Sequence, residues 1–113
     1  MKTKDIQKKM KFKVVSGKEF LEKDVKGGYV GDLLSDILAG SKEGDLWLTV
    51  QVHPNIIAVS AMKGHSAILI TSSKKVDEET IEKAKEEKVV ILSTEMNSFE
   101  AAGKIFQLLE NEK

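Results

Sequence analysis

The second half of the chain alternates short apolar runs with segments of helical spacing. Three apolar runs have the length of buried strands: Leu46–Val52, Ala67–Ile70 and Val89–Leu92. A helical pattern follows each run: Ile57, Ala58 and Ala61 up to Gly64, then Asp77–Glu87, then a helix capped by Asn97. Three successive strand–helix units predict parallel strands joined by right-handed crossovers, with helices covering both faces of the sheet.

The first half of the chain is less regular. Its pattern predicts, in order, a helix over Thr3–Met10, a strand over Phe12–Val15, a turn of helix over Lys18–Leu21, a strand over Val25–Val30 and a helix over Asp32–Ala39. No linker or low-complexity stretch divides the sequence. We therefore expect residues 1–113 to form one domain, a three-layer α/β/α fold around a mainly parallel sheet of four to five strands.

The last predicted helix has a long apolar stripe. Phe99, Ala102, Gly103, Phe106 and Leu109 line one face of it. Gly103 precedes a lysine, as in a phosphate-binding P-loop, but Ile105 stands where the magnesium-binding hydroxyl of that motif belongs. The sequence therefore favours a close contact between helix and sheet at Gly103.

The charge balance excludes several classes of protein. All 18 basic residues are lysines and 18 residues are acidic, so the formal net charge is +0. A neutral chain has no overall field to draw it to nucleic acid or to an anionic membrane, so neither is an expected partner.

There is no cysteine, which excludes disulfides and thiolate chemistry. No apolar run approaches the ~20 residues of a membrane span and no signal core opens the sequence, so a cytoplasmic protein is expected.

Polar residues follow the predicted strands, at the sheet edge where open α/β sheets usually bind ligands. The candidates are Gln51, His53 and Asn55 after one strand, Thr71, Ser72 and Ser73 after the next, and Ser93 and Thr94 after the last. Gly28 and Asp32 belong to the densest glycine segment, which also runs into a helix. The alternative is structural, because loops and helix caps prefer the same residue types. An early acid such as Asp32 can likewise offset a helix dipole.

The two histidines offer little chemistry by themselves. His53 could act as a general base, but it would need an acidic partner and a nucleophile, and neither is near it in the sequence. His65 follows the helix-ending Gly64 and is expected in a surface loop. Two histidines twelve positions apart without cysteine make a poor zinc pattern, so no metal site is predicted.

Four segments are distinctive in combination: Gly27–Asp36, Gln51–Ile56, Asp77–Ala84 and Ile91–Thr94. Through them the chain resembles the DRTGG domain family, and in particular its short stand-alone members related to HPr serine kinase. The resemblance implies a fold similar to the amino-terminal domain of HPr kinase/phosphorylase. It does not imply kinase activity, because the catalytic machinery of such proteins lies in other domains.

The sequence departs from the motif that names the family. Where many members carry Asp-Arg, this chain has Gln51–Asn55, and where they carry Thr-Gly-Gly it has Thr71–Ser73. A ligand bound at this edge would therefore depend on Lys74, Lys75, backbone amides and His53.

The sequence favours a non-catalytic regulatory or ligand-sensing module, expected to be a homodimer. Its ligand would be a nucleotide or phosphorylated metabolite at the carboxyl edge of the sheet, and no cofactor is indicated. One alternative is an interaction subunit that docks on a metabolic enzyme through an apolar face around Tyr29, Leu33 and Ile37. The least favoured is a small acyl- or phosphoryl-transfer enzyme that uses His53.

Overall fold

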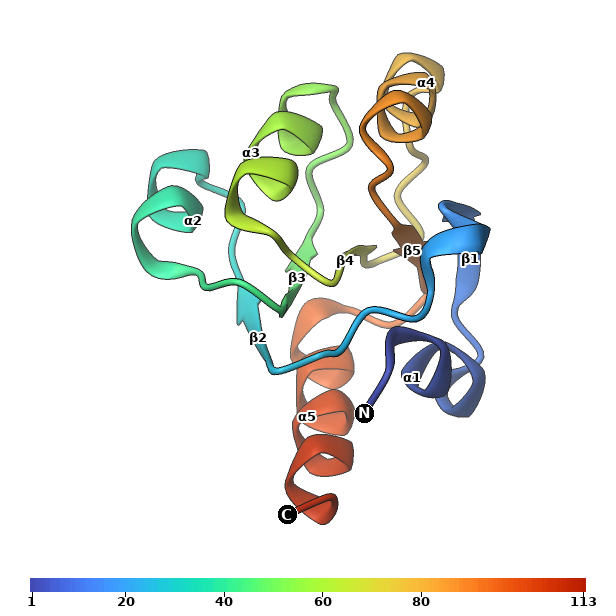
Figure 1. Ribbon diagram of the computed structural model, residues 1–113, viewed down its shortest axis with the longest axis vertical. Helices are drawn as coiled ribbons and strands as arrows, with labels where there is room; N and C mark the ends of the chain where they lie inside the picture. Colours follow the sequence, from blue (N-terminus) through green and yellow to red (C-terminus); the bar gives the residue numbers. More distant parts are fainter.

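A five-stranded sheet lies between two layers of helices in the computed structural model, which describes residues 1–113 (Figure 1). The strands are β1 (Lys13–Ser16), β2 (Gly27–Val30), β3 (Asp45–Thr49), β4 (Ala67–Ile70) and β5 (Ile91–Ser93). Their order in the sheet is β1-β5-β4-β3-β2. Strands β2 to β5 are parallel, and β1 pairs antiparallel with β5. The predicted α/β fold with a mainly parallel sheet is confirmed.

Five helices cover the two faces of this sheet. They are α1 (Thr3–Met10), α2 (Leu34–Gly40), α3 (Asn55–Lys63), α4 (Glu78–Glu87) and α5 (Ser98–Asn111), with a short 3-10 turn at Lys18–Phe20. Ile6 of α1 and Ala101 and Ile105 of α5 belong to the core cluster on one face. Residues of α2, α3 and α4 belong to the cluster on the other face. No helix has both the length and the apolar character that a membrane crossing requires.

The central strands alternate between these two cores. In β3, Leu46 and Leu48 face the core that contains α1 and α5, whereas Trp47 faces the core that contains α2 to α4. All five residues of β3 and all four of β4 are buried. Strands buried on both faces read as continuous apolar runs, which is why the sequence revealed them.

Asp32 explains why two predicted elements are shorter in the structure. The carboxylate oxygen Oδ1 of Asp32 accepts hydrogen bonds from Thr49 Oγ1 (2.7 Å) and from the Val50 amide (3.0 Å). These bonds tie the segment after β2 to the end of β3. As a result β3 ends at Thr49 instead of Val52, and α2 begins at Leu34 instead of Asp32.

The close contact predicted between Gly103 and the sheet is wrong, and the phenylalanines of the apolar stripe of α5 point outward. The buried side chains of the helix are Ala101 and Ile105, whereas Phe99 is 91% exposed and Phe106 is 65% exposed. A Cβ atom at Gly103 would meet nothing within 4 Å, so this glycine makes no close contact with the sheet. The helix has two apolar faces, and the one that includes the phenylalanines points outward.

The prediction for His65 is also wrong. Its side chain is buried, with 4% of the residue exposed, between the hydroxyls of Ser41 and Ser60. The imidazole lies 5.5 Å from the ring of Trp47. The left-handed Gly64 ends α3 and turns the chain inward, which a sequence pattern does not reveal.

Candidate functional site

The carboxyl ends of the four parallel strands lie at one edge of the sheet, as predicted. The register pairs Val30 with Leu48, Thr49 with Ile70, and Ile70 with Ser93. The candidate residues after these strands do not form one cluster, however. They divide into groups with different surroundings.

Asp32 and Gln51 form the first group, and both take part in holding the edge together. Besides the two bonds that Asp32 accepts from the end of β3, Gln51 donates from Nε2 to the Asp32 carbonyl (3.1 Å). Asp36, one helical turn later, accepts a hydrogen bond from the Tyr29 hydroxyl (2.9 Å), which raises the pKa of Tyr29. These contacts indicate that Asp32 stabilises the loop at the edge of the sheet and support the structural alternative to ligand binding.

No group of three or more His, Asp or Glu side chains is placed to hold a metal ion.

The serine pair after β4 has an unusual backbone. Ser72 and Ser73 have φ values of 61° and 55°, in the left-handed region that favours glycine. Their amides donate to the carbonyls of Met96 (2.8 Å) and Thr94 (3.0 Å). The loop therefore has the conformation expected of a Gly-Gly pair, and its two amides are already used to hold the segment after β5.

Thr71 precedes this pair and is buried. Its hydroxyl lies 2.7 Å from the hydroxyl of Ser98, the first residue of α5. The contact joins the end of β4 to the start of α5, so Thr71 is not accessible to a ligand.

His53 has an acidic partner that is distant in sequence. Its Nδ1 lies 2.6 Å from Oδ2 of Asp77, the residue before α4, and both side chains are partly exposed. Such a contact can fix the orientation of an imidazole ring, and Asp77 is the partner that the sequence analysis did not find. Asn55, at the start of α3, is exposed to solvent.

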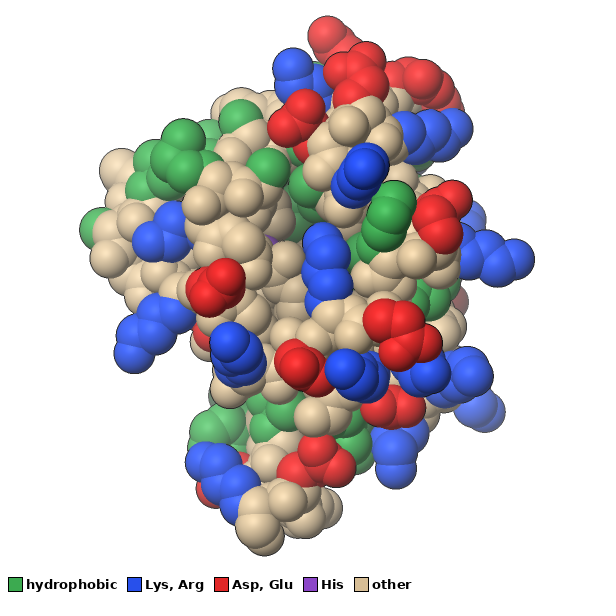
Figure 2. Space-filling view, viewed as in Figure 1, with side chains coloured by type: hydrophobic (Ala, Val, Ile, Leu, Met, Phe, Trp, Pro, Cys, Tyr) green, Lys and Arg blue, Asp and Glu red, His purple; other side chains and the backbone are tan.

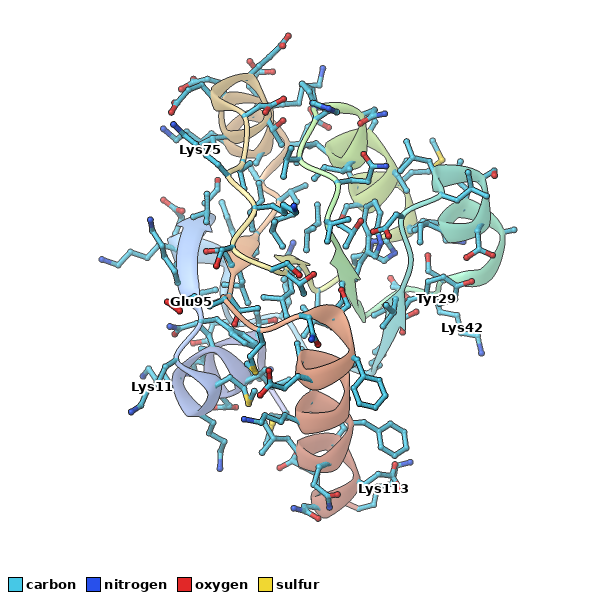
Figure 3. All side chains as sticks on the ribbon, turned by 180° about the vertical axis from the view of Figure 1, so that it is seen from behind. Lys11, Tyr29, Lys42, Lys75, Glu95 and Lys113 are labelled. Carbon is cyan, nitrogen blue, oxygen red and sulfur yellow. The ribbon has the colours of Figure 1, made fainter.

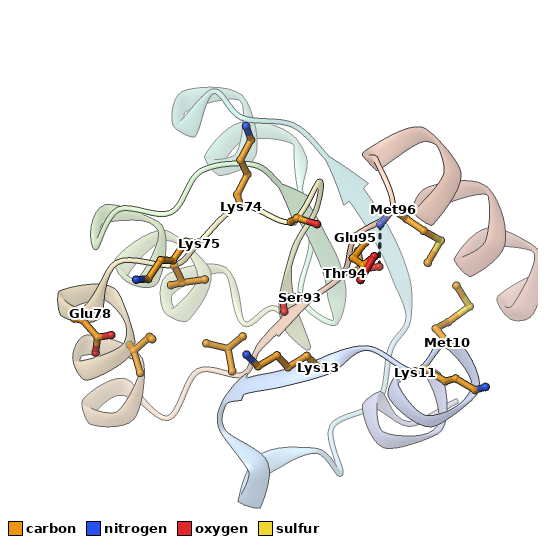
Figure 4. Close-up of a pocket in the computed structure, with 14 residues that line it drawn as sticks. Met10, Lys11, Lys13, Lys74, Lys75, Glu78, Ser93, Thr94, Glu95 and Met96 are labelled. Carbon is orange, nitrogen blue, oxygen red and sulfur yellow. Dashed lines mark hydrogen bonds between the residues drawn. The ribbon is translucent and has the colours of Figure 1, made fainter.

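A cavity of about 800 Å³ lies beside the end of β5 (Figure 4). Three candidates line it: Ser73, Ser93 and Thr94. Figure 4 shows Ser93 in the middle of the lining side chains, with Lys13 of β1 next to it and Lys75 toward α4. The other lining residues are Met10, Lys11, Val15, Lys74, Val76, Glu78, Ile81, Glu95 and Met96. The volume is within the range of small-molecule sites, about 300–1,000 Å³.

The cavity is positive although the chain as a whole is neutral. Four lysines and two glutamates line it, which gives a local charge of +2. None of these four lysines has a carboxylate within 4 Å of its ammonium group, and all the ion pairs of the molecule involve other lysines, histidine or the chain terminus. Elsewhere lysines and acids are interspersed over the surface, as Figure 2 shows for one face. The cavity thus offers unpaired cations beside hydroxyl groups, a combination suited to an anion.

Two of the cavity lysines were missed by sequence reasoning. Lys11 and Lys13 were not among the candidates, because they lie at the start of the first predicted strand and follow no parallel strand. Strand β1 instead runs antiparallel beside β5 and pairs Lys13 with Ser93. Nothing in the sequence of the predicted strand Phe12–Val15 indicated that it would pair with β5. Lys74 and Lys75 were anticipated, because they follow the altered motif directly.

Gly28 lies on a different surface. It lines a second hollow of about 400 Å³ together with residues of α5. Figure 3 shows Lys11, Lys75 and Glu95 along one side of the molecule and Tyr29 on the other. Gly28 is therefore separate from the cavity beside β5.

The fold is similar to that of a solved regulatory region. This is the crystal structure of the CBS and DRTGG domains of Clostridium perfringens pyrophosphatase complexed with its activator, diadenosine tetraphosphate. The TM-score is 0.71 at 21% sequence identity, and the match covers 92% of this chain and 45% of that chain. The present chain thus spans less than half of the regulatory region it matches.

Two comparisons of sequence gave different results. The search of curated proteins found no match. The family model of the DRTGG domain matches residues 5–108. The chain therefore belongs to the DRTGG domain family.

Proposed function

We propose that this DRTGG domain is a non-catalytic regulatory module that binds a nucleotide or phosphorylated metabolite in the cavity beside β5. The observation that carries the proposal is the set of four unpaired lysines, Lys11, Lys13, Lys74 and Lys75, around a hollow lined by hydroxyls. Lysine binds phosphate as a mobile point charge, so the loss of arginine from the family motif does not prevent anion binding. Residues 1–113 act together as one such domain.

The proposal assigns different roles to the ten candidate residues. Ser73, Ser93 and Thr94 supply hydroxyls to the ligand, because they line the cavity. The remaining candidates support the edge of the sheet or lie away from the cavity: Gly28, Asp32, Gln51, His53, Asn55, Thr71 and Ser72. His53 is thereby left without a catalytic role, although its contact with Asp77 is the one observation in favour of acyl or phosphoryl transfer.

Binding to the folded state alone raises the melting temperature by mass action, which provides the test. Inorganic phosphate, AMP, ATP, diadenosine tetraphosphate and an acyl phosphate are compared at low and moderate salt. At least one organic phosphate should raise the melting temperature, and added salt should reduce the shift because it screens the lysines.

The variant Lys13→Ala/Lys75→Ala distinguishes binding in the cavity from non-specific attraction to surface lysines. It should abolish the shift in melting temperature. Lys42 is exposed on the other side of the molecule, so Lys42→Ala should keep the shift (Figure 3). The proposal fails if no compound changes the melting temperature, or if the double variant retains the full shift.

Docking on a metabolic enzyme is the second candidate function. It is favoured by the structural match, because the matched DRTGG domain is part of the regulatory region of a pyrophosphatase. The surface that was predicted for docking changes in one respect: Leu33 is 67% exposed, but Ile37 is buried in the core. A module that senses a ligand for an enzyme would need both functions, so the two candidates are compatible.

A further inference from the structure

A long apolar surface lies along α5, away from the lysine-lined cavity. The α5–β2 groove is the hollow of about 400 Å³ formed by Phe99, Ala102, Gly103 and Phe106 of α5 with Gly28 and Val30 of β2. Phe99, Phe106 and Val30 are exposed by 91%, 65% and 50%. Figure 3 shows aromatic rings that project from α5 on the side of β2. Large side chains so fully in water indicate a surface that another molecule covers.

Gly103 gives a second, independent reason to expect a partner at this surface. It occupies the middle of a 14-residue helix, where glycine is less favourable than alanine. A Cβ at this position would meet nothing within 4 Å, so the single chain has no steric need for glycine here. A second backbone that crosses α5 closely would have that need.

We infer that the α5–β2 groove is the interface of a two-fold dimer in which α5 packs antiparallel against α5 of a second copy and crosses it at Gly103. Phe99 lies four residues before Gly103 and Phe106 three residues after it, on the same face of the helix. An antiparallel crossing at Gly103 sets Phe99 of each copy against Phe106 of the other. The stripe is thus complementary to itself, as a two-fold interface requires.

Charge complementarity supports the same arrangement. Glu100 and Lys104 lie on one flank of the apolar stripe and are 3.7 Å apart within the chain. A two-fold axis through the crossing brings that flank against the same flank of the second copy in reverse direction. Glu100 of each copy then faces Lys104 of the other, so both charges gain an opposite neighbour.

The exposed apolar side chains supply about half of the area of a standard dimer interface. From full side-chain areas of about 150–250 Å², Phe99, Phe106 and Val30 expose nearly 400 Å² per copy. Two copies would cover about 800 Å² with these side chains alone, half of the roughly 1,600 Å² of a standard interface. Strand β2 is also the edge of the sheet, and its uncovered backbone adjoins the groove.

Analytical ultracentrifugation of the full chain over a wide concentration range tests this dimer. Wild type should sediment as a dimer, and Phe99→Glu and Phe106→Glu should each weaken dimerisation by about 30-fold or more. Met62→Glu is the matched control: Met62 is 75% exposed on α3, outside the groove, so its substitution should leave the dimer intact.

Gly103→Leu distinguishes loss of the dimer from loss of the fold. Leucine favours a helix more than glycine does, so this variant should fold at least as well as wild type and yet be monomeric. Glu100→Lys should weaken dimerisation, and Glu100→Lys/Lys104→Glu should restore it. Wild type that remains monomeric at every concentration overturns the inference. So does a Gly103→Leu or Phe106→Glu variant that dimerises like wild type. The proposed ligand site is tested separately, because Phe106→Glu leaves the cavity lysines in place.

Discussion

The buried histidine makes the stability of this domain depend on pH. Ser41 Oγ donates to the Ile37 carbonyl (2.6 Å), so it accepts from Nε2–H of His65 at 2.9 Å. Nδ1 of His65 then accepts from the Ser60 hydroxyl (3.2 Å), and the ring is neutral. Burial lowers the pKa of His65 to about 4. Burial is the main cause of this lowered pKa; the charge of Asp45 raises the pKa of His65 and the charge of Lys63 lowers it.

The sign and size of the effect follow from proton linkage. In the unfolded chain His65 takes up a proton near its ordinary pKa of 6.5, whereas the folded chain takes it up only near 4. Neutral His65 therefore makes its full contribution to the stability of the fold above pH 6.5. This contribution is lost as the pH falls from 6.5 to about 4. A difference of this size amounts to about 3 kcal/mol in the free energy of unfolding.

Urea unfolding at pH 7 and at pH 4 measures this loss, with protein concentration held constant. Trp47, the single tryptophan, is fully buried and reports unfolding by fluorescence. His65→Gln cannot titrate, so its loss of stability between the two pH values should be about 3 kcal/mol smaller than that of wild type. His65→Gln should be less stable than wild type at pH 7 by roughly 1–3 kcal/mol, and at pH 4 it should be as stable as wild type or more stable.

His53→Gln is the matched control. His53 is exposed, and its substitution leaves His65 in place, so this variant should keep the pH dependence that His65 causes. Parallel pH curves for wild type and His65→Gln would refute the reasoning. A titration of His65 near pH 6.5 in the NMR spectrum of the folded protein would refute it too.

Two further predictions concern backbone conformation. Ser72→Gly and Ser73→Gly should each leave the fold unchanged and stabilise it by up to about 1 kcal/mol in thermal unfolding, because both residues have positive φ; destabilisation by either would show that a serine side chain outweighs the strain. At the end of β1, two neighbouring alanine substitutions should have opposite effects. Ser16→Ala should be neutral or stabilising by about 1 kcal/mol, because its buried hydroxyl has no partner. Gly17→Ala should destabilise by about 2 kcal/mol or more, because φ is +84° and a Cβ would lie 2.8 Å from Val90 Cα. Equal unfolding free energies for these two variants would contradict the expectation.

The order and type of the elements could be predicted because the central strands are buried on both faces. Such strands appear in the sequence as uninterrupted apolar runs, and Ala67–Ile70 was located without error. The boundaries at Thr49 and Leu34 could not be predicted. They depend on the hydrogen bonds of Asp32 to the end of β3, a contact between residues 17 positions apart. The outward direction of Phe99 was unpredictable for another reason: both faces of α5 are apolar, and the sequence alone does not say which face the sheet covers.

The edge of the sheet could be predicted to carry the candidate site, but not its shape. Parallel strands bring their carboxyl ends together whatever the loops contain, so Ser73 and Ser93 were found by position alone. The cavity also depends on β1, the one antiparallel strand, which brings Lys13 beside Ser93. The partner of His53 was missed for a similar reason, because Asp77 reaches it only after the chain has passed through α3 and β4.

The neutral total charge of the chain does not determine the charge around one cavity. Equal numbers of lysines and acids give the molecule no net charge and so argue against a strong overall field. They do not determine which lysines are neutralised by neighbours. Five lysines form ion pairs with acids on the surface: Lys2, Lys4, Lys85, Lys104 and Lys113. The four around the cavity form none. Because a partly enclosed pocket screens charge less than open solvent does, the excess of four lysines over two glutamates at the cavity can attract a small anion to a protein whose net charge is zero.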